Sequence, residues 1–135
     1  ANQGKGHGVA FADFDQDGDL DVYVGLGGHY PGDLWPNSLY RNNGIPGTMF
    51  TVKLNGAAPN PSAIGGQVVL HSGNHVQRLE VQSGGGFGST DSYSLEFGLG
   101  KRTQVDSLKV FWPSGKMEQY GPLPANHPLE FHQSK

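Results

Sequence analysis

The sequence Tyr-Ser-Leu-Glu-Phe-Gly-Leu at residues 93–99 shows most clearly how this chain is built. Large apolar side chains occupy every second position, and small or polar ones lie between them. Successive side chains of a β-strand point to opposite faces of the sheet, so the alternation predicts a strand with one buried face. Leu108, Val110 and Trp112 repeat the pattern within residues 105–112, where Phe111 is out of phase and is either exposed or part of a second buried face.

Short strands of the same kind are expected on both sides of these two. Turn-forming residues separate them, for example Ser72-Gly73-Asn74 and Pro113-Ser114-Gly115. No segment of helical periodicity intervenes, so the pattern favours an all-β sandwich or a partly open barrel over an alternating β/α fold. The additional expected strands are 49–54, 66–71, 75–81, 116–120 and 128–132.

Composition supports this fold class and excludes several functions. The chain of 135 residues contains 22 Gly and 9 Pro, with 35% hydrophobic and 16% charged residues, as expected for many short strands joined by tight turns. It contains no Cys, which excludes disulfides and thiolate metal sites. No apolar run approaches the roughly 20 residues of a membrane-spanning helix, and no basic cluster suggests nucleic acid or a membrane surface as partner.

The N-terminal third of the chain predicts a separate small β module. A long connection rich in Gly and Pro, residues 25–37, joins its second and third strands, and the composition changes near Gly47. We therefore expect two modules, residues 1–47 and 48–135. The strands expected in the first module are 9–12, 20–24 and 38–41.

Five of the twelve acidic residues lie within nine positions, between the first two of these strands. Their spacing is D-x-D-x-D-G-x-x-D, in which alternate carboxylates converge as the backbone wraps and Gly18 permits a sharp turn. A hard divalent cation binds six to eight oxygens, and such a loop offers many, which favours Ca²⁺ over Mg²⁺. The predicted ligands are the side chains of Asp13, Asp15, Asp17 and Asp21, the backbone carbonyl of Asp19, and water.

The alternative to a metal site is a solvated acidic turn. Like charges fixed in a compact loop repel one another by roughly 1 kcal/mol per close pair even in water, so an ordered loop without a cation is disfavoured. A helix–loop–helix calcium hand is excluded, because its twelfth position requires a bidentate Glu and the chain has Val24 there, inside a predicted strand.

Residues 8–23, followed by Leu39-Tyr40-Arg41-Asn42-Asn43-Gly44, resemble an FG-GAP/VCBS repeat, the calcium-loop blade of integrin-α-like β-propellers. The remainder of the chain is similar to the ASPIC/UnbV domain, which commonly follows such repeats in secreted bacterial proteins and in the cartilage acidic protein family. The segments that carry this second resemblance are 64–66, 80–87, 97–100, 105–106 and 112–115.

The two resemblances imply a calcium-binding protein of the extracellular space or cell surface, with an adhesive or structural role and no catalytic residues. They transfer ligand roles to the five aspartates only. A propeller requires several blades, whereas this chain has one such repeat. The solitary blade is therefore expected to pack on the second module, on other copies of the chain in a self-assembled fibre or oligomer, or on the rest of a larger protein.

Two other functions remain open on sequence grounds. Tyr30 and Trp35 lie in the Gly- and Pro-rich connection and suggest a carbohydrate-binding module, because aromatic rings stack on sugars. The chain is alternatively a non-catalytic accessory domain of a secreted enzyme. His71 and His75 flank a predicted turn, where they are candidates for a metal pair across a hairpin. The nucleophile-elbow motif G-x-S-x-G is absent from the sequence, so we expect no enzyme activity.

Overall fold

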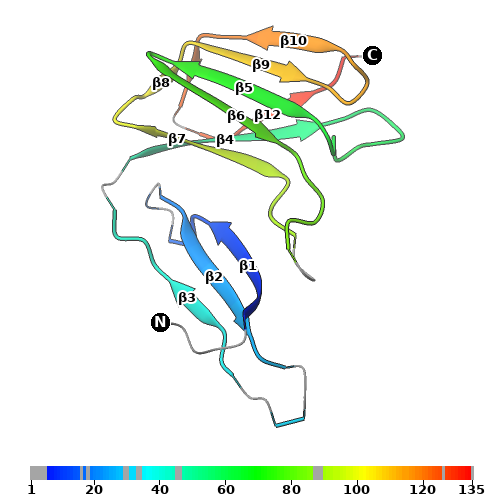
Figure 1. Ribbon diagram of the computed structural model, residues 1–135. Coiled ribbons are helices and arrows are strands. Elements are labelled where there is room, and N and C mark those ends of the chain that lie inside the picture. The colour runs from blue at the N-terminus through cyan, green and yellow to red at the C-terminus, as the bar shows by residue number, and fades with distance from the viewer. Residues whose placement is uncertain are drawn as a thin grey trace.

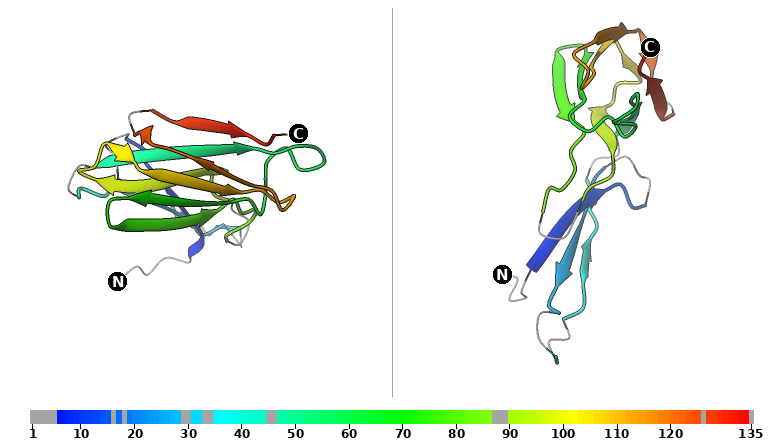
Figure 2. Two further views of the ribbon diagram at one scale, coloured as in Figure 1. Left: turned by 90° about the horizontal axis from the view of Figure 1, so that it is seen from above. Right: turned by 90° about the vertical axis from the view of Figure 1, so that its right-hand side faces the viewer.

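The computed structural model confirms an all-β chain with several separate sheets, and the residues that it describes form no closed barrel (Figure 1). Its larger part is a sandwich-like pair of sheets, and a smaller sheet lies at one side of it (Figures 1 and 2). Within the described ranges, no helix has the length and apolar character needed to cross a membrane. The structure describes residues 6–15, 17, 19–28, 31–32, 35–44, 47–86, 90–125 and 127–134.

The sandwich consists of two sheets and a short additional ribbon. The first sheet has the strand order β10-β9-β5-β6, comprising Met117–Tyr120, Ser107–Phe111, Gln67–Ser72 and His75–Glu80. The second has the order β12-β4-β7, comprising Leu129–His132, Thr48–Asn55 and Ser94–Gly100. The ribbon pairs β11, Leu123–Pro124, with β8, Gln104–Val105.

The core lies between the two sheets, where alternate side chains of each strand meet. Leu95, Phe97 and Leu99 of β7 are buried, as the alternation in residues 93–99 predicts. Their partners come mainly from the neighbouring strand β4 and from β5 and β9 of the facing sheet. Phe111 is 40% exposed, so it is an exposed aromatic residue and β9 has only one buried face.

The prediction of a single strand over 105–112 is wrong, because the chain leaves the sheet at Asp106. The Asp106 backbone N–H donates to the His71 carbonyl over 2.9 Å, and its carboxylate accepts the Gly73 N–H over 2.7 Å. Asp106 thereby closes the β5–β6 turn, while Val105 pairs with Leu123 of β11 in the separate ribbon. Strand β11 itself had no recognisable alternation, since it is only two residues long.

Strand β12 pairs parallel with β4, from Leu129 opposite Val52 to His132 opposite Asn55. The Gln133 N–H extends the pairing by donating to the Asn55 carbonyl over 2.9 Å. The first and last strands of the sandwich are therefore neighbours in one sheet.

The small sheet has the antiparallel order β1-β2-β3, comprising Gly6–Ala12, Asp21–Leu26 and Ser38–Tyr40. Every buried hydrophobic residue of the described chain lies between Phe50 and Phe131, so this sheet contributes none to the core. Its register places Val9, Phe11 and Tyr40 on one face and Tyr23 and Leu39 on the other, and all five are exposed. Both faces of the small sheet are therefore apolar and largely open.

Candidate metal centre

The acidic loop is the turn of the β1–β2 hairpin. Ala12 pairs with Asp21, so residues 13–20 form the connection between the two strands. The loop lies at the end of the hairpin that approaches the sandwich (Figure 1). A cavity there is lined by Asp13 together with Met49 and Thr51 of β4 and Glu96 of β7. The fold thus presents the loop to the outer face of the β12-β4-β7 sheet.

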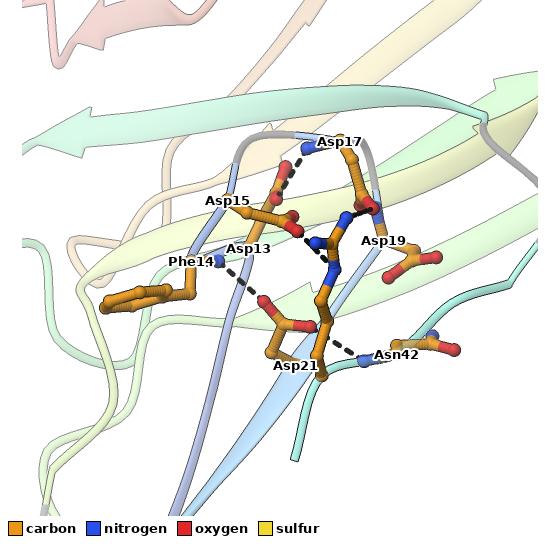
Figure 3. A network of polar contacts seen from close by, with 8 residues as sticks. Asp13, Phe14, Asp15, Asp17, Asp19, Asp21 and Asn42 are labelled. Atoms are coloured by element: carbon orange, nitrogen blue, oxygen red, sulfur yellow. Dashed lines mark hydrogen bonds and ion pairs between the residues drawn. The ribbon is translucent and has the colours of Figure 1, made fainter. Parts of the chain in front are cut away.

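Three of the five predicted ligands converge. One carboxylate oxygen each from Asp13, Asp15 and Asp17 lie within 4.8 Å of one another (Figure 3). The loop backbone fixes this arrangement, because Asp13 Oδ1 accepts the Asp17 N–H over 3.1 Å and Asp17 Oδ1 accepts the Asp19 N–H over 3.2 Å. Alternate carboxylates therefore point to one place as the chain wraps, in the way that the spacing predicts.

A positive charge already lies against this cluster. The Arg41 Nε atom is 2.6 Å from Asp15 Oδ2, and its Nη2 atom is 3.5 Å from Asp17 Oδ2. The Arg41 side chain is 61% exposed, so it is not part of a packed core. Arg41 therefore offsets part of the negative charge of Asp15 and Asp17.

Asp21 differs from the other loop aspartates because it is only 2% exposed. Its Oδ2 accepts the Phe14 N–H over 3.0 Å, and its Oδ1 accepts the Asn42 N–H over 2.8 Å (Figure 3). Both bonds join a buried charge to backbone donors, which offsets the desolvation of the carboxylate. Asp21 therefore fastens the loop to the segment that follows β3, and its role as a ligand stays a prediction.

Asp19 has one carboxylate oxygen in unusual surroundings. Its Oδ1 is buried and has no hydrogen-bond partner among the described residues. Burial of the carboxyl raises the pKa of Asp19, and the charges of Asp17, Asp21 and Asp15 raise it further, while a hydrogen bond from the Gly44 N–H acts in the opposite direction. An unpaired oxygen among like charges is the kind of group that a hard cation stabilises, but the Asp19 carboxylate is not among the three that lie within 4.8 Å of one another, so its role as a ligand stays a prediction.

The sandwich adds another acidic group to this region. Glu96 lines the same cavity, of about 450 Å³, as Asp13 and His127. Burial raises the pKa of Glu96, and the charge of Asp13 raises it further. The negative potential of the loop thus extends onto the face of β7.

For Tyr30 and Trp35 the carbohydrate contact stays a prediction, and of the two predicted histidines the structure gives the positions. Gly18 and Tyr30 lie outside the described residues, and Trp35 is 49% exposed. The β5–β6 register places His71 opposite Val76 and His75 opposite Ser72. His71 and His75 therefore project from opposite faces of the hairpin and do not form a metal pair.

Sequence reasoning assigned no role to the residues that follow β3 or to Glu96. Arg41 pairs with two loop carboxylates, and the N–H groups of Asn42 and Gly44 bond Asp21 and Asp19. Arg41, Asn42 and Gly44 lie in the segment 39–44, which is part of the resemblance to the FG-GAP/VCBS repeat. That resemblance was the sequence feature that could have indicated their importance. No sequence feature pointed to Glu96, because its position beside the acidic loop depends on how the β1-β2-β3 sheet lies against the β12-β4-β7 sheet.

Comparison with known proteins gives a family and several relatives. The family described as ASPIC and UnbV matches residues 56–135. Cartilage acidic protein 1 of Mus musculus and that of Homo sapiens are each 31% identical to the chain over 125 residues, covering 85% of it. The Xenopus tropicalis protein of the same name is 33% identical over 124 residues. The chain spans 17% of the length of each relative. The family match begins at residue 56, so the FG-GAP/VCBS resemblance stays a prediction.

Proposed function

The chain belongs to the ASPIC and UnbV family, and on this basis we propose that it is an extracellular, non-catalytic module that binds Ca²⁺ in the loop from Asp13 to Asp21. Its likeness to proteins whose name ties them to cartilage supports the extracellular setting. We also propose that residues 1–47 are an FG-GAP/VCBS-like module attached to an ASPIC/UnbV-like domain of residues 48–135.

The convergence of Asp13, Asp15 and Asp17 within 4.8 Å carries the calcium proposal. Asp19 supports it with a buried, unpartnered oxygen, and the oxygen-only chemistry of the set suits a hard cation. These residues would hold the ion, which would supply two positive charges where Arg41 supplies one. Arg41 is then displaced toward solvent or retained at the rim of the site.

The structural role follows from where the loop lies. It connects β1 to β2, it is fastened to the segment after β3 through Asp21 and Asn42, and it faces β4 and β7 of the sandwich. A cation bound here neutralises charge at the junction of the small sheet and the sandwich. Calcium would therefore stabilise both the hairpin and its contact with the larger module.

Calorimetry and thermal melting in calcium, and then in excess chelator, test this function. We expect a binding isotherm near one ion per chain and a higher melting temperature in calcium, since ligand at about 100 times its Kd stabilises a folded protein by about 2.7 kcal/mol. Asp15→Asn should weaken binding on the order of tenfold, because it removes a charged ligand.

Glu130→Gln is the matched control, because Glu130 lies on β12 with Asn55 and Lys53 as its partners and is not part of the loop. It should leave calcium binding unchanged. The proposal would be contradicted if calcium produced no heat of binding and if neither calcium nor chelator changed the melting temperature. Equal binding by the wild type and Asp15→Asn would place the ion elsewhere.

A further inference from the structure

A second cavity, of about 210 Å³, lies between the small sheet and the sandwich. Phe11 and Leu20 of the hairpin contribute to one side, and Leu79 of β6 and Leu95 of β7 contribute to the other. Leu95 belongs to the core and Leu79 packs against it, so this part of the wall is firmly held. The cavity therefore has an apolar surface shared by two sheets, and the ring of Phe11, 52% exposed, lies at it.

The polar part of the same cavity carries one sign of charge. Glu80, Asp91 and Glu96 line it, and no Lys, Arg or His does so among the described residues. Glu80 Oε2 accepts the Gln67 amide over 2.9 Å, which fixes the direction of that carboxylate.

We infer that this groove binds the side chain of an arginine or lysine presented by a partner polypeptide. Such a side chain has an aliphatic stem and a cationic head, and the groove offers leucines for the stem and carboxylates for the head. The Phe11 ring adds a surface on which a guanidinium or ammonium group is favoured. The volume is below the roughly 300 Å³ at which pockets for whole small molecules begin, so it suits one side chain.

This site shares Glu96 with the cavity beside Asp13, but it contains none of the proposed calcium ligands. Its wall includes none of Asp13, Asp15, Asp17, Asp19 or Asp21. The apolar half of the wall is unsuited to a hard cation, which requires oxygens on all sides. Because one side of the groove belongs to β1 and the other to the sandwich, a bound basic side chain touches both parts of the chain. The partner surface is therefore a basic one.

The test is an NMR titration of the ¹⁵N-labelled full chain, in calcium, with the capped peptide acetyl-Gly-Arg-Gly-amide. The same peptide with citrulline, a neutral residue of nearly the same shape, is the control ligand. We expect the arginine peptide to shift the amide signals of Leu79, Ser92 and Ser94, and the citrulline peptide to bind at least threefold more weakly. Raising the salt concentration should weaken the arginine peptide selectively, because its charge pairs lie at an exposed rim.

Variants locate the binding. Asp91→Asn and Glu80→Gln should each weaken the arginine peptide about two- to fivefold, the range expected for exposed ion pairs. Glu130→Gln, an equal charge change outside the groove, should have no effect. Asp15→Asn should also have none, so a failure of the calcium proposal and a failure of this one are distinguishable.

Three outcomes would overturn the inference. Equal binding of the citrulline peptide would show that charge is not recognised, and signal shifts remote from the residues that line the groove would place the ligand elsewhere. If calcium alone shifted the same amide signals and prevented the peptide from binding, the groove would be a metal site.

Discussion

The aspartate side chains of the acidic loop have different structural roles. Asp13, Asp15 and Asp17 place oxygens together, whereas the buried Asp21 uses both oxygens to hold backbone N–H groups. The spacing of the motif predicts the convergence because alternate residues of a tight loop share one side. It does not predict the Arg41 pairing or the environment of Asp19, since both depend on the segment after β3 coming back to the loop.

A second carboxylate with unusual surroundings anchors the C-terminal segment. Glu118 Oε2 accepts the Trp112 indole N–H over 2.8 Å and the Tyr120 hydroxyl over 2.6 Å, and Oε1 accepts the Ser134 hydroxyl over 2.5 Å. The Ser134 hydroxyl, followed by that of Tyr120, lowers the pKa of Glu118 from 4.5 to about 2. Burial, with Glu118 as an added cause, raises the pKa of Tyr120 to about 12.

The lowered pKa predicts an acid-sensitive contribution to stability. The ionised form of Glu118 is favoured in the folded chain, so its contribution is present above pH 4.5 and is lost as the pH falls through about 2. Melting temperatures measured between pH 6 and pH 2 should fall less steeply in Glu118→Gln than in the wild type. Ser134→Ala, which removes the principal donor, should give an intermediate slope. Identical slopes in all three proteins would contradict this assignment.

At the scale of elements, the described residues contain each expected strand, except that residues 105–112 are divided at Asp106, and they contain the two-residue β11, which was not predicted. The prediction of a strand over residues 93–99 corresponds to β7. It succeeded because one face of this strand is buried in the core and the other is more exposed, which gives the sequence a clear alternation. The break at Asp106 depends on its bonds to His71 and Gly73, which are remote in sequence. The parallel pairing of β12 with β4 is equally non-local, and no pattern within either strand indicates it.

The turn between β10 and β11 depends on one glycine. Gly121 has φ of +133°, and a Cβ there would lie 2.6 Å from the Asp106 carbonyl oxygen. Gly121→Ala should therefore destabilise the sandwich by about 1–3 kcal/mol or more, through backbone strain and the clash together. Urea unfolding measures the change. Gly98→Ala is the control, because a Cβ at Gly98 on β7 meets nothing within 4 Å, and it should be close to neutral.

At the scale of the whole molecule, the hydrophobic core is unevenly distributed. The sandwich has a packed interior, whereas the β1-β2-β3 sheet exposes apolar side chains on both faces and has none buried among its described residues. Exposed apolar side chains are typical of a site that contacts other protein when they lie on a sheet whose outer strands, among the described residues, pair on one side only. We therefore predict that the small sheet associates with other copies of the chain or with neighbouring β modules.

Sedimentation velocity at micromolar concentration, in calcium, tests self-association. We expect species heavier than the 14.4 kDa monomer. Leu39→Ser, on an open face of the small sheet, should shift the distribution toward monomer, because it removes a side chain that is 46% exposed. Val76→Ser is the matched control, since Val76 is 60% exposed but lies on β6 of the sandwich. A monomer in all three proteins would contradict association between copies.

The parallel pairing of β12 with β4 has a mechanical consequence. Tension applied between Thr48 and His132 pulls the two strands past each other along their length, since those residues lie at opposite ends of the pair. Every hydrogen bond of the pair then bears load at once, in shear, whereas the antiparallel β5–β6 hairpin pulled at Gln67 and Glu80 opens one bond at a time. Single-molecule pulling through the first attachment should therefore require the larger force.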